Sequence, residues 1–175
     1  MKSITAVVVV ALAAMCLLGA DDKPKHNTLT DTEKADGWIL LFDGKETEGW
    51  KVEGEAKVVD GVLVVGGDKP AKLKTTDTFG KLELRFEYRT EGKKGDVPST
   101  MVRVFLLPTE NDKRGAWNEL TLTAEGKTIR SENKEPDGKQ KLEITLGEEP
   151  GDVPVEFEVD AGSKLYLRNV KLKKR

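Results

Sequence analysis

The sequence is poor in the side chains that most often carry covalent or metal chemistry, with one cysteine and one histidine in 175 residues. Cys16 lies in an N-terminal stretch that we predict to be removed, so the mature protein would have no thiol and no disulfide. His26 precedes the first expected strand and lies outside the predicted fold. Nucleophilic triads usually need a histidine as base, and zinc sites favour histidine and cysteine ligands. Triads are therefore effectively excluded, and zinc sites nearly so.

The sequence also lacks an excess of basic residues, because its formal net charge is −2. Nucleic-acid binding needs a basic surface that neutralises phosphates, so we expect no nucleic-acid partner. Calcium loops place oxygen ligands at fixed offsets, and the aspartates of the expected turns form no such pattern. Solvated turn residues are the favoured interpretation of these aspartates, and we predict no metal and no cofactor.

The first 20 residues have the pattern of a signal peptide. Lys2 is followed by an apolar stretch over 4–18 and by two small residues, which predicts cleavage after Ala20. The apolar stretch is shorter than the ~20 residues of a comfortable membrane span. An uncleaved anchor and lipidation at Cys16 are the weaker alternatives. We expect a secreted or periplasmic protein with no stable membrane span after cleavage.

Residues 21–36 contain few side chains that could be buried, which predicts a disordered N-terminal tail. The stretch 37–175 has no long linker and no alignable repeat, so we expect it to form one domain. Its length suffices to bury a core without disulfide bonds.

The expected strands begin with the apolar run 38–42, which is closed by Asp43-Gly44 and is typical of a fully buried strand ending in a tight turn. Trp50 begins the next strand and is large enough to anchor a core. Asp60-Gly61 lies between two apolar runs and predicts a hairpin. Within 81–89 apolar and charged residues alternate, which predicts a strand with one buried and one solvated face.

Two further patterns bear on the architecture. Residues 101–107 are apolar on both faces apart from Arg103, so this strand is expected to be central. The three-residue step between Leu167 and Val170 breaks the period of two and predicts a β-bulge near Arg168-Asn169. About ten short strands separated by turn residues predict an all-β fold, a sandwich or jelly roll of two antiparallel sheets.

Carboxylate pairs are candidate catalytic groups, because most glycosidases use two of them. Glu83 and Glu87 are about 13 Å apart along one strand, which exceeds the spacing of either glycosidase geometry. Glu87 would be closer to Glu119 if their strands were neighbours, a pairing that the sequence does not show. The alternation of apolar and charged residues over 81–89 also fits glutamates that only form a charged, solvated face of the strand. That alternative to a catalytic role stays open.

Three other side chains are candidates for contacting a ligand. A buried arginine needs a carboxylate or a cleft, so Arg103 has either a structural ion pair or a ligand-facing role. Trp117 is a candidate for stacking on a sugar, and Arg85 is a further candidate contact on the face of its strand that carries Glu87.

The stretch from Gly37 to Val52 resembles the opening of the 3-keto-disaccharide hydrolase family, which consists of secreted bacterial domains. The family shares a phrase of the kind G-[WF]-x-x-L-F-[DN]-G-K-x-x-x-G-W. The residues that match it are Gly37, Trp38, Leu41, Phe42, Asp43, Gly44, Lys45, Gly49 and Trp50. Later similarities lie, in the family's order, at 59–63, 79–89, 116–120 and 165–172.

The resemblance implies a concanavalin-like jelly roll that cleaves glycosides carrying a 3-keto group, by hydrolysis or elimination. Glu87, Glu119 and Arg103 would then line the concave face as base and charge stabilisers. Two departures from the family favour a carbohydrate-binding module without catalysis. The interval before Trp117 is short, and Asp160-Ala161-Gly162 has no histidine where the family tends to have one. A structural envelope protein is a third interpretation, so the sequence leaves enzymatic activity open.

Overall fold

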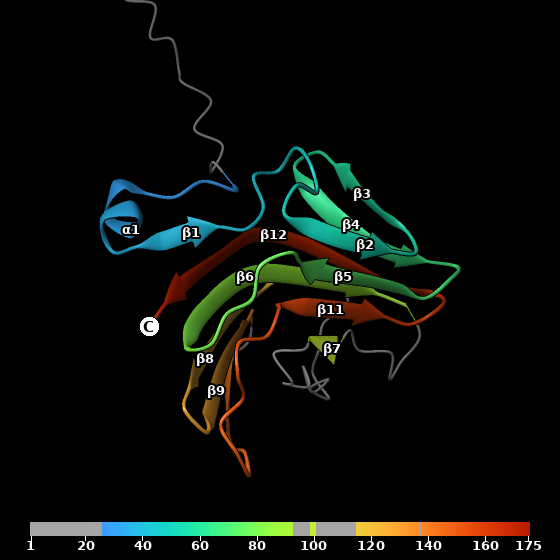
Figure 1. Ribbon diagram of the computed structural model, residues 1–175. Coiled ribbons are helices and arrows are strands. Elements are labelled where there is room, and N and C mark those ends of the chain that lie inside the picture. The colour runs from blue at the N-terminus through green and yellow to red at the C-terminus, as the bar shows by residue number, and fades with distance from the viewer. Residues whose placement is uncertain (1–25, 93–98, 101–114, 137) are drawn as a thin grey trace, which may run out of the picture.

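The computed structural model describes residues 26–92, 99–100, 115–136 and 138–175 (Figure 1). The elements that precede the first gap are α1 (Asp31–Ala35), β1 (Trp38–Leu40), β2 (Trp50–Glu53), β3 (Ala56–Val59), β4 (Val62–Gly67), β5 (Ala71–Thr75) and β6 (Leu82–Glu91). The later elements are β7 (Ser99–Thr100), β8 (Asn118–Glu125), β9 (Thr128–Glu135), β10 (Gly138–Thr145), β11 (Glu156–Val159) and β12 (Ser163–Lys174).

The strands form two sheets. The larger has eight strands in the order β10-β9-β8-β6-β12-β4-β3, with β1 paired to β12 off this path. The smaller has four strands in the order β2-β5-β11-β7. The strand pairs are antiparallel in both sheets. The predicted all-β fold with two antiparallel sheets is confirmed.

The hydrophobic core lies between the two sheets, and β6 shows why the sequence forms it. The apolar members of its alternating pattern, Leu82, Leu84, Phe86 and Tyr88, are buried in the core cluster. Phe86 meets Phe157 of the smaller sheet edge to face, with ring centroids 5.3 Å apart. The charged members of the pattern therefore lie on the outer face of the eight-stranded sheet, away from the core.

The predicted hairpin and the predicted bulge are both confirmed. Asp60 and Gly61 join β3 to β4 with φ values of 51° and 76°, the left-handed conformation that a tight hairpin turn requires. The register between β12 and β6 shifts between Arg168 and Lys171, and Asn169 has a φ of 53° there. The bulge turns the Asn169 side chain out of the regular alternation.

The run 38–42 does not form the fully buried strand that its apolar character predicts. Strand β1 has three residues, pairs with β12 and leaves Ile39 40% exposed. Trp38 is buried, but it lies outside the core cluster and under the guanidinium of Arg85, whose Cζ is 4.4 Å from the ring centroid. Trp50 does anchor the core, as predicted, and its Nε1 donates to the Leu41 carbonyl at 2.6 Å.

The prediction of a disordered tail over 21–36 is wrong for the described residues 26–36. Helix α1 begins with a capping box in which Thr30 and Glu33 exchange hydrogen bonds, and Glu33 contacts Lys171 of β12. Asn27 is 6% exposed and binds the sheet. Figure 1 shows α1 and β1 beside β12. The expected signal peptide lies outside the described residues, among which no helix is long and apolar enough to cross a membrane.

Candidate functional site

Two of the predicted catalytic carboxylates face each other on the outer face of the larger sheet. Glu87 of β6 and Glu119 of β8 are directly opposite in the antiparallel register. Side chains at such positions have Cβ atoms about 5 Å apart. The structure therefore supplies the pairing that the sequence could not show, at a spacing within reach of one sugar ring.

Each carboxylate forms an ion pair with a cation on its other neighbouring strand, the one that does not carry the second carboxylate. The Nε of Arg168 on β12 lies 2.6 Å from Glu87 Oε2, and the Nζ of Lys134 on β9 lies 2.7 Å from Glu119 Oε1. The four side chains occupy one register position across four strands, in the order Lys134, Glu119, Glu87, Arg168. We call them the charged row. The two outer cations offset the repulsion between the two carboxylates at its centre.

The burial of the charged row differs between its ends. The side chains of Glu87 and Arg168 are 27% and 19% exposed, whereas those of Glu119 and Lys134 are 43% and 44% exposed. The Glu87 end is therefore less hydrated, and electrostatic interactions there are less screened by water.

Trp117, the predicted sugar-stacking residue, lies just before β8 and is half-buried. Arg168 Cζ lies 3.9 Å from its ring centroid, and Arg89 Cζ lies 5.8 Å away. Arg89 also stacks on Tyr166, whose hydroxyl donates to Glu91. Burial and this hydrogen bond raise the pKa of Tyr166. Trp117 is thus fixed beside the charged row, with part of its ring covered by arginine.

Arg85, the other predicted ligand contact, is held by structural partners. Its Nη2 and Nε lie 2.6 and 3.0 Å from Glu83 Oε1, and it covers Trp38. Arg175 Nη2 lies 2.5 Å from the other Glu83 oxygen. Burial alone would raise the pKa of Glu83, but the hydrogen bonds from Arg175 and Arg85 outweigh it and lower that pKa. Arg103, the remaining predicted site residue, lies outside the described residues.

Asn169 connects the N-terminal segment to Glu87, and sequence analysis missed it. Its Nδ2 donates to Glu87 Oε1 at 2.6 Å and lies 3.2 Å from His26 Nδ1. The break in alternation at 167–170 predicts the bulge, but it does not predict that Asn169 contacts Glu87 and His26. His26 was placed outside the predicted fold, and that placement is wrong. Its contact spans 143 residues of sequence, which no local pattern reveals.

Of the hollows in the described part of the molecule, one lies beside the charged row. One of about 390 Å³ lies on the outer face over β8, β9 and β10 and is lined by Thr121, Thr123, Arg130, Ser131, Glu132, Lys141, Leu142 and Glu143. Thr121 is two residues from Glu119 on the same face, so this polar hollow adjoins the row.

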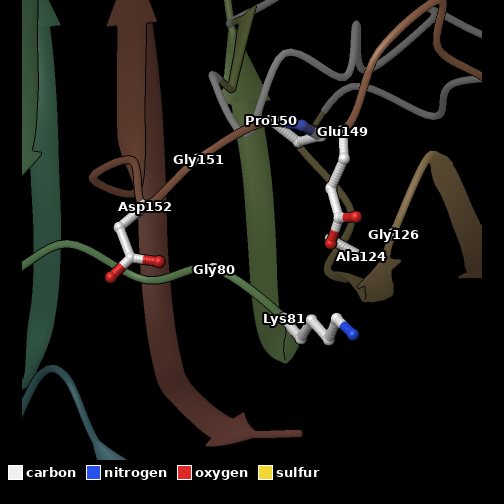
Figure 2. A pocket seen from close by; sticks show the side chains of 8 residues that line it. All are labelled: Gly80, Lys81, Ala124, Gly126, Glu149, Pro150, Gly151 and Asp152. Atoms are coloured by element: carbon white, nitrogen blue, oxygen red, sulfur yellow. The ribbon is translucent and has the colours of Figure 1, made fainter.

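Another hollow, of about 380 Å³, is shown in Figure 2 and is lined by Gly80, Lys81, Ala124, Gly126 and residues 149–152. Lys81, Glu149 and Asp152 bring both signs of charge to its edge, and it contains no residue of the charged row. A third, of about 580 Å³, shares 149–151 with it and includes Lys74 and Glu156. Among the described residues, no group of three or more histidine, cysteine or acidic side chains could hold a metal ion.

Residues 37–106 match the 3-keto-alpha-glucoside-1,2-lyase-like domain family. The match confirms the resemblance that the opening motif predicts, and it is consistent with a short, diverged member of that family. It extends from the residue before β1 past β6, so it includes Glu87 and Arg85. His26, Trp117, Glu119 and Asn169 lie outside the matched range. No curated protein matches the sequence.

Several solved structures share the fold of this protein. A presumed glycosyl hydrolase from Parabacteroides distasonis ATCC 8503 superposes with a TM-score of 0.69 at 19% identity, over 86% of this chain and 100% of that one. The VIP36 exoplasmic/lumenal domain bound to Ca²⁺ and Man3GlcNAc gives a TM-score of 0.58 at 9% identity, over 80% and 89% of the two chains.

A plant lectin-like protein shares the fold as well. Arcelin-5 from Phaseolus vulgaris, a lectin-like defense protein, gives a TM-score of 0.55 at 12% identity, over 74% of this chain and 95% of that one. At these identities the likeness shows the fold alone. The predicted concanavalin-like jelly roll is confirmed.

Proposed function

We propose that the protein binds a glycoside bearing a 3-keto group on the outer face of the eight-stranded sheet and cleaves it there. The observation that supports this most is the opposed pair Glu87 and Glu119. The expected separation of their carboxyl groups is of the order of 5 Å, within the range over which two carboxyls act on one glycosidic bond. The family match supplies the substrate class.

The chemistry follows from the acidity of a hydrogen next to a ketone. Glu87 takes the proton from C2, and the C–H electron pair forms the C1=C2 bond as the bond from C1 to the leaving oxygen breaks. A carboxylic acid form of Glu119 gives that oxygen its proton. Addition of water to the product would make the net reaction a hydrolysis. Glu87 suits the base because Arg168 and Asn169 fix its two oxygens in place.

The surroundings of the pair offer contacts for a sugar. Trp117 presents an aromatic surface beside Glu87, and the hollow over β8–β10 presents hydroxyl and charged groups beside Glu119. Sugars use both kinds of contact, since their C–H faces pack on rings and their hydroxyls hydrogen-bond. Arg168 connects the two parts of the site because it contacts both Trp117 and Glu87.

Carbohydrate binding without cleavage is the second candidate. It is favoured by the ion pairs of both carboxylates, since a carboxylate oxygen that is bound to a cation is less available to a reacting substrate atom. In this case the charged row would serve only to orient hydroxyl groups. The shortened interval before Trp117 is consistent with it.

The test is incubation of the purified protein with 3-keto-trehalose, with products followed by mass spectrometry. Glu87→Gln and Glu119→Gln are each expected to lower kcat by at least about 100-fold, the usual contribution of a general acid or base. The control is Glu158→Gln, which removes an ion-paired glutamate of similar exposure from the smaller sheet. Binding without turnover would support the second candidate, and absence of both from folded protein would overturn the proposal.

Export by cleavage after Ala20 is part of the same proposal and rests on the sequence pattern of residues 1–20. N-terminal sequencing of protein recovered from the periplasm or the medium is expected to begin at Asp21. Protein that stays in the cytoplasm with Met1 intact would overturn it.

A further inference from the structure

His26 is fixed on the outer face, beside β12, although 143 residues separate it in sequence from Asn169 on that strand. Its neighbour Asn27 forms a reciprocal pair with Asn169, in which each backbone N–H donates to the other side chain's Oδ1, at 2.6 and 2.7 Å. Asn27 Nδ2 also donates to the Gly61 carbonyl at 2.7 Å. Three hydrogen bonds at a buried residue therefore hold the backbone next to His26 against the bulge of β12 and the β3–β4 turn.

The same bonds fix the orientation of the Asn169 amide. Because its Oδ1 accepts from Asn27, its Nδ2 must be the atom that faces Glu87 and His26. Nδ2 carries two hydrogens, one of which it donates to Glu87 Oε1 at 2.6 Å. The other is available to His26 Nδ1 at 3.2 Å. A donor opposite Nδ1 requires that Nδ1 accept, so the proton of the neutral ring resides on Nε2.

We propose that His26 presents its Nε2–H as a hydrogen-bond donor to the ketone oxygen of the substrate, beside the base Glu87. This inference rests on the proposed function. When Glu87 takes the C2 proton, negative charge develops on the ketone oxygen, and a fixed neutral donor stabilises it. His26 keeps its proton throughout, so the proton released from carbon goes to Glu87 alone.

The geometry supports a joint role for the two groups. Glu87 Oε1 and His26 Nδ1 both lie within hydrogen-bonding distance of the same nitrogen of Asn169. Asn169 therefore acts as a positioning residue for both, because a shift of its amide moves the base and the donor together. His26 is half-buried, which leaves part of the ring accessible to a ligand.

Nitrogen-15 NMR of the ring tests the inference directly, since His26 is the only histidine in the chain and gives one unambiguous set of signals. At neutral pH we expect the Nε2-protonated tautomer in the wild-type protein, and a mixture of tautomers in Asn169→Gly, which removes the amide but accepts a positive φ. Titration with 3-keto-trehalose is expected to shift the Nε2 signal.

Kinetic measurements on His26 variants provide a second test of the inference. His26→Ala is expected to lower kcat by about 100- to 1,000-fold, the usual effect of losing one such donor, with little change in KM. His26→Gln, which keeps an N–H donor, is expected to recover part of the rate. A mixture of tautomers in the wild-type protein, or a fixed tautomer whose signal 3-keto-trehalose leaves unchanged, would overturn the inference. Absence of turnover in the wild-type protein would contradict the proposed cleavage reaction. The NMR measurements test the tautomer of His26 and its contact with 3-keto-trehalose without turnover, so they distinguish a failure of this inference from a failure of the proposed function.

Discussion

Glu87 and Glu119 stand directly opposite each other on neighbouring antiparallel strands, and the cation that balances each one comes from the strand beyond it. Two like charges at opposed positions destabilise a sheet when nothing balances them. In the folded protein Lys134 and Arg168 supply that balance, so the two carboxylates are retained side by side on the outer face.

Removal of the cation beside Glu119 should expose the repulsion within the pair. Lys134→Met is expected to lower the free energy of unfolding by up to about 1 kcal/mol, because the pair is exposed to solvent. Glu119→Gln in the Lys134→Met background should then restore stability. Urea denaturation of the two single variants and the double variant measures this coupling. Lys141→Met is the control, since its partner Glu132 retains Lys139.

Asn169 combines a left-handed backbone with hydrogen bonds to three residues, and two substitutions separate these roles. Asn169→Ala removes the bonds and places an alanine at φ 53°, so we expect a loss of about 2–4 kcal/mol in the free energy of unfolding. Asn169→Gly removes the same bonds without the backbone strain and should cost about 1 kcal/mol less. Equal losses in urea denaturation would show that the strain is absent.

Glu83 should make the protein sensitive to acid. Its pKa is lower in the folded protein than its ordinary value of 4.5. The stability that it contributes is therefore fully present above that value and is lost as the pH falls through the lower folded pKa. Urea midpoints measured from pH 7 to pH 3 should show wild type above Glu83→Gln at neutral pH and the two converging in acid. A constant difference across this range would contradict the assignment.

Trp117 should contribute to carbohydrate affinity. Trp117→Ala removes both the ring and the support that it gives to Arg168, so the dissociation constant for 3-keto-trehalose is expected to rise by at least about tenfold. Calorimetry in the Glu87→Gln background measures binding without turnover. Trp117→Phe should retain part of the affinity. Tyr166→Phe keeps its ring and loses only the hydroxyl bonded to Glu91, so it should bind as the parent does.

The sequence by itself determined the local features of the fold. Alternation over 81–89 predicted which side of β6 is buried, Asp60-Gly61 predicted its hairpin, and the step from Leu167 to Val170 predicted the bulge. These features depend on residues within a few positions of one another, and backbone geometry reports them directly. The capping box of Thr30 and Glu33 was an equally local signal, and it would have predicted α1 inside the expected tail.

Only the tertiary structure decided which residues meet. Strand order and register place Glu119 opposite Glu87, and a sequence pattern fixes neither, because any outward-facing residue of β8 fits the same alternation. The edge position of β1 likewise depends on its pairing with β12 and not on its own apolar run. His26 reaches Asn169 only because the segment before α1 is held against the bulge. The individual strands and turns are thus products of local patterns, and the sheet order and the candidate site are products of long-range pairing.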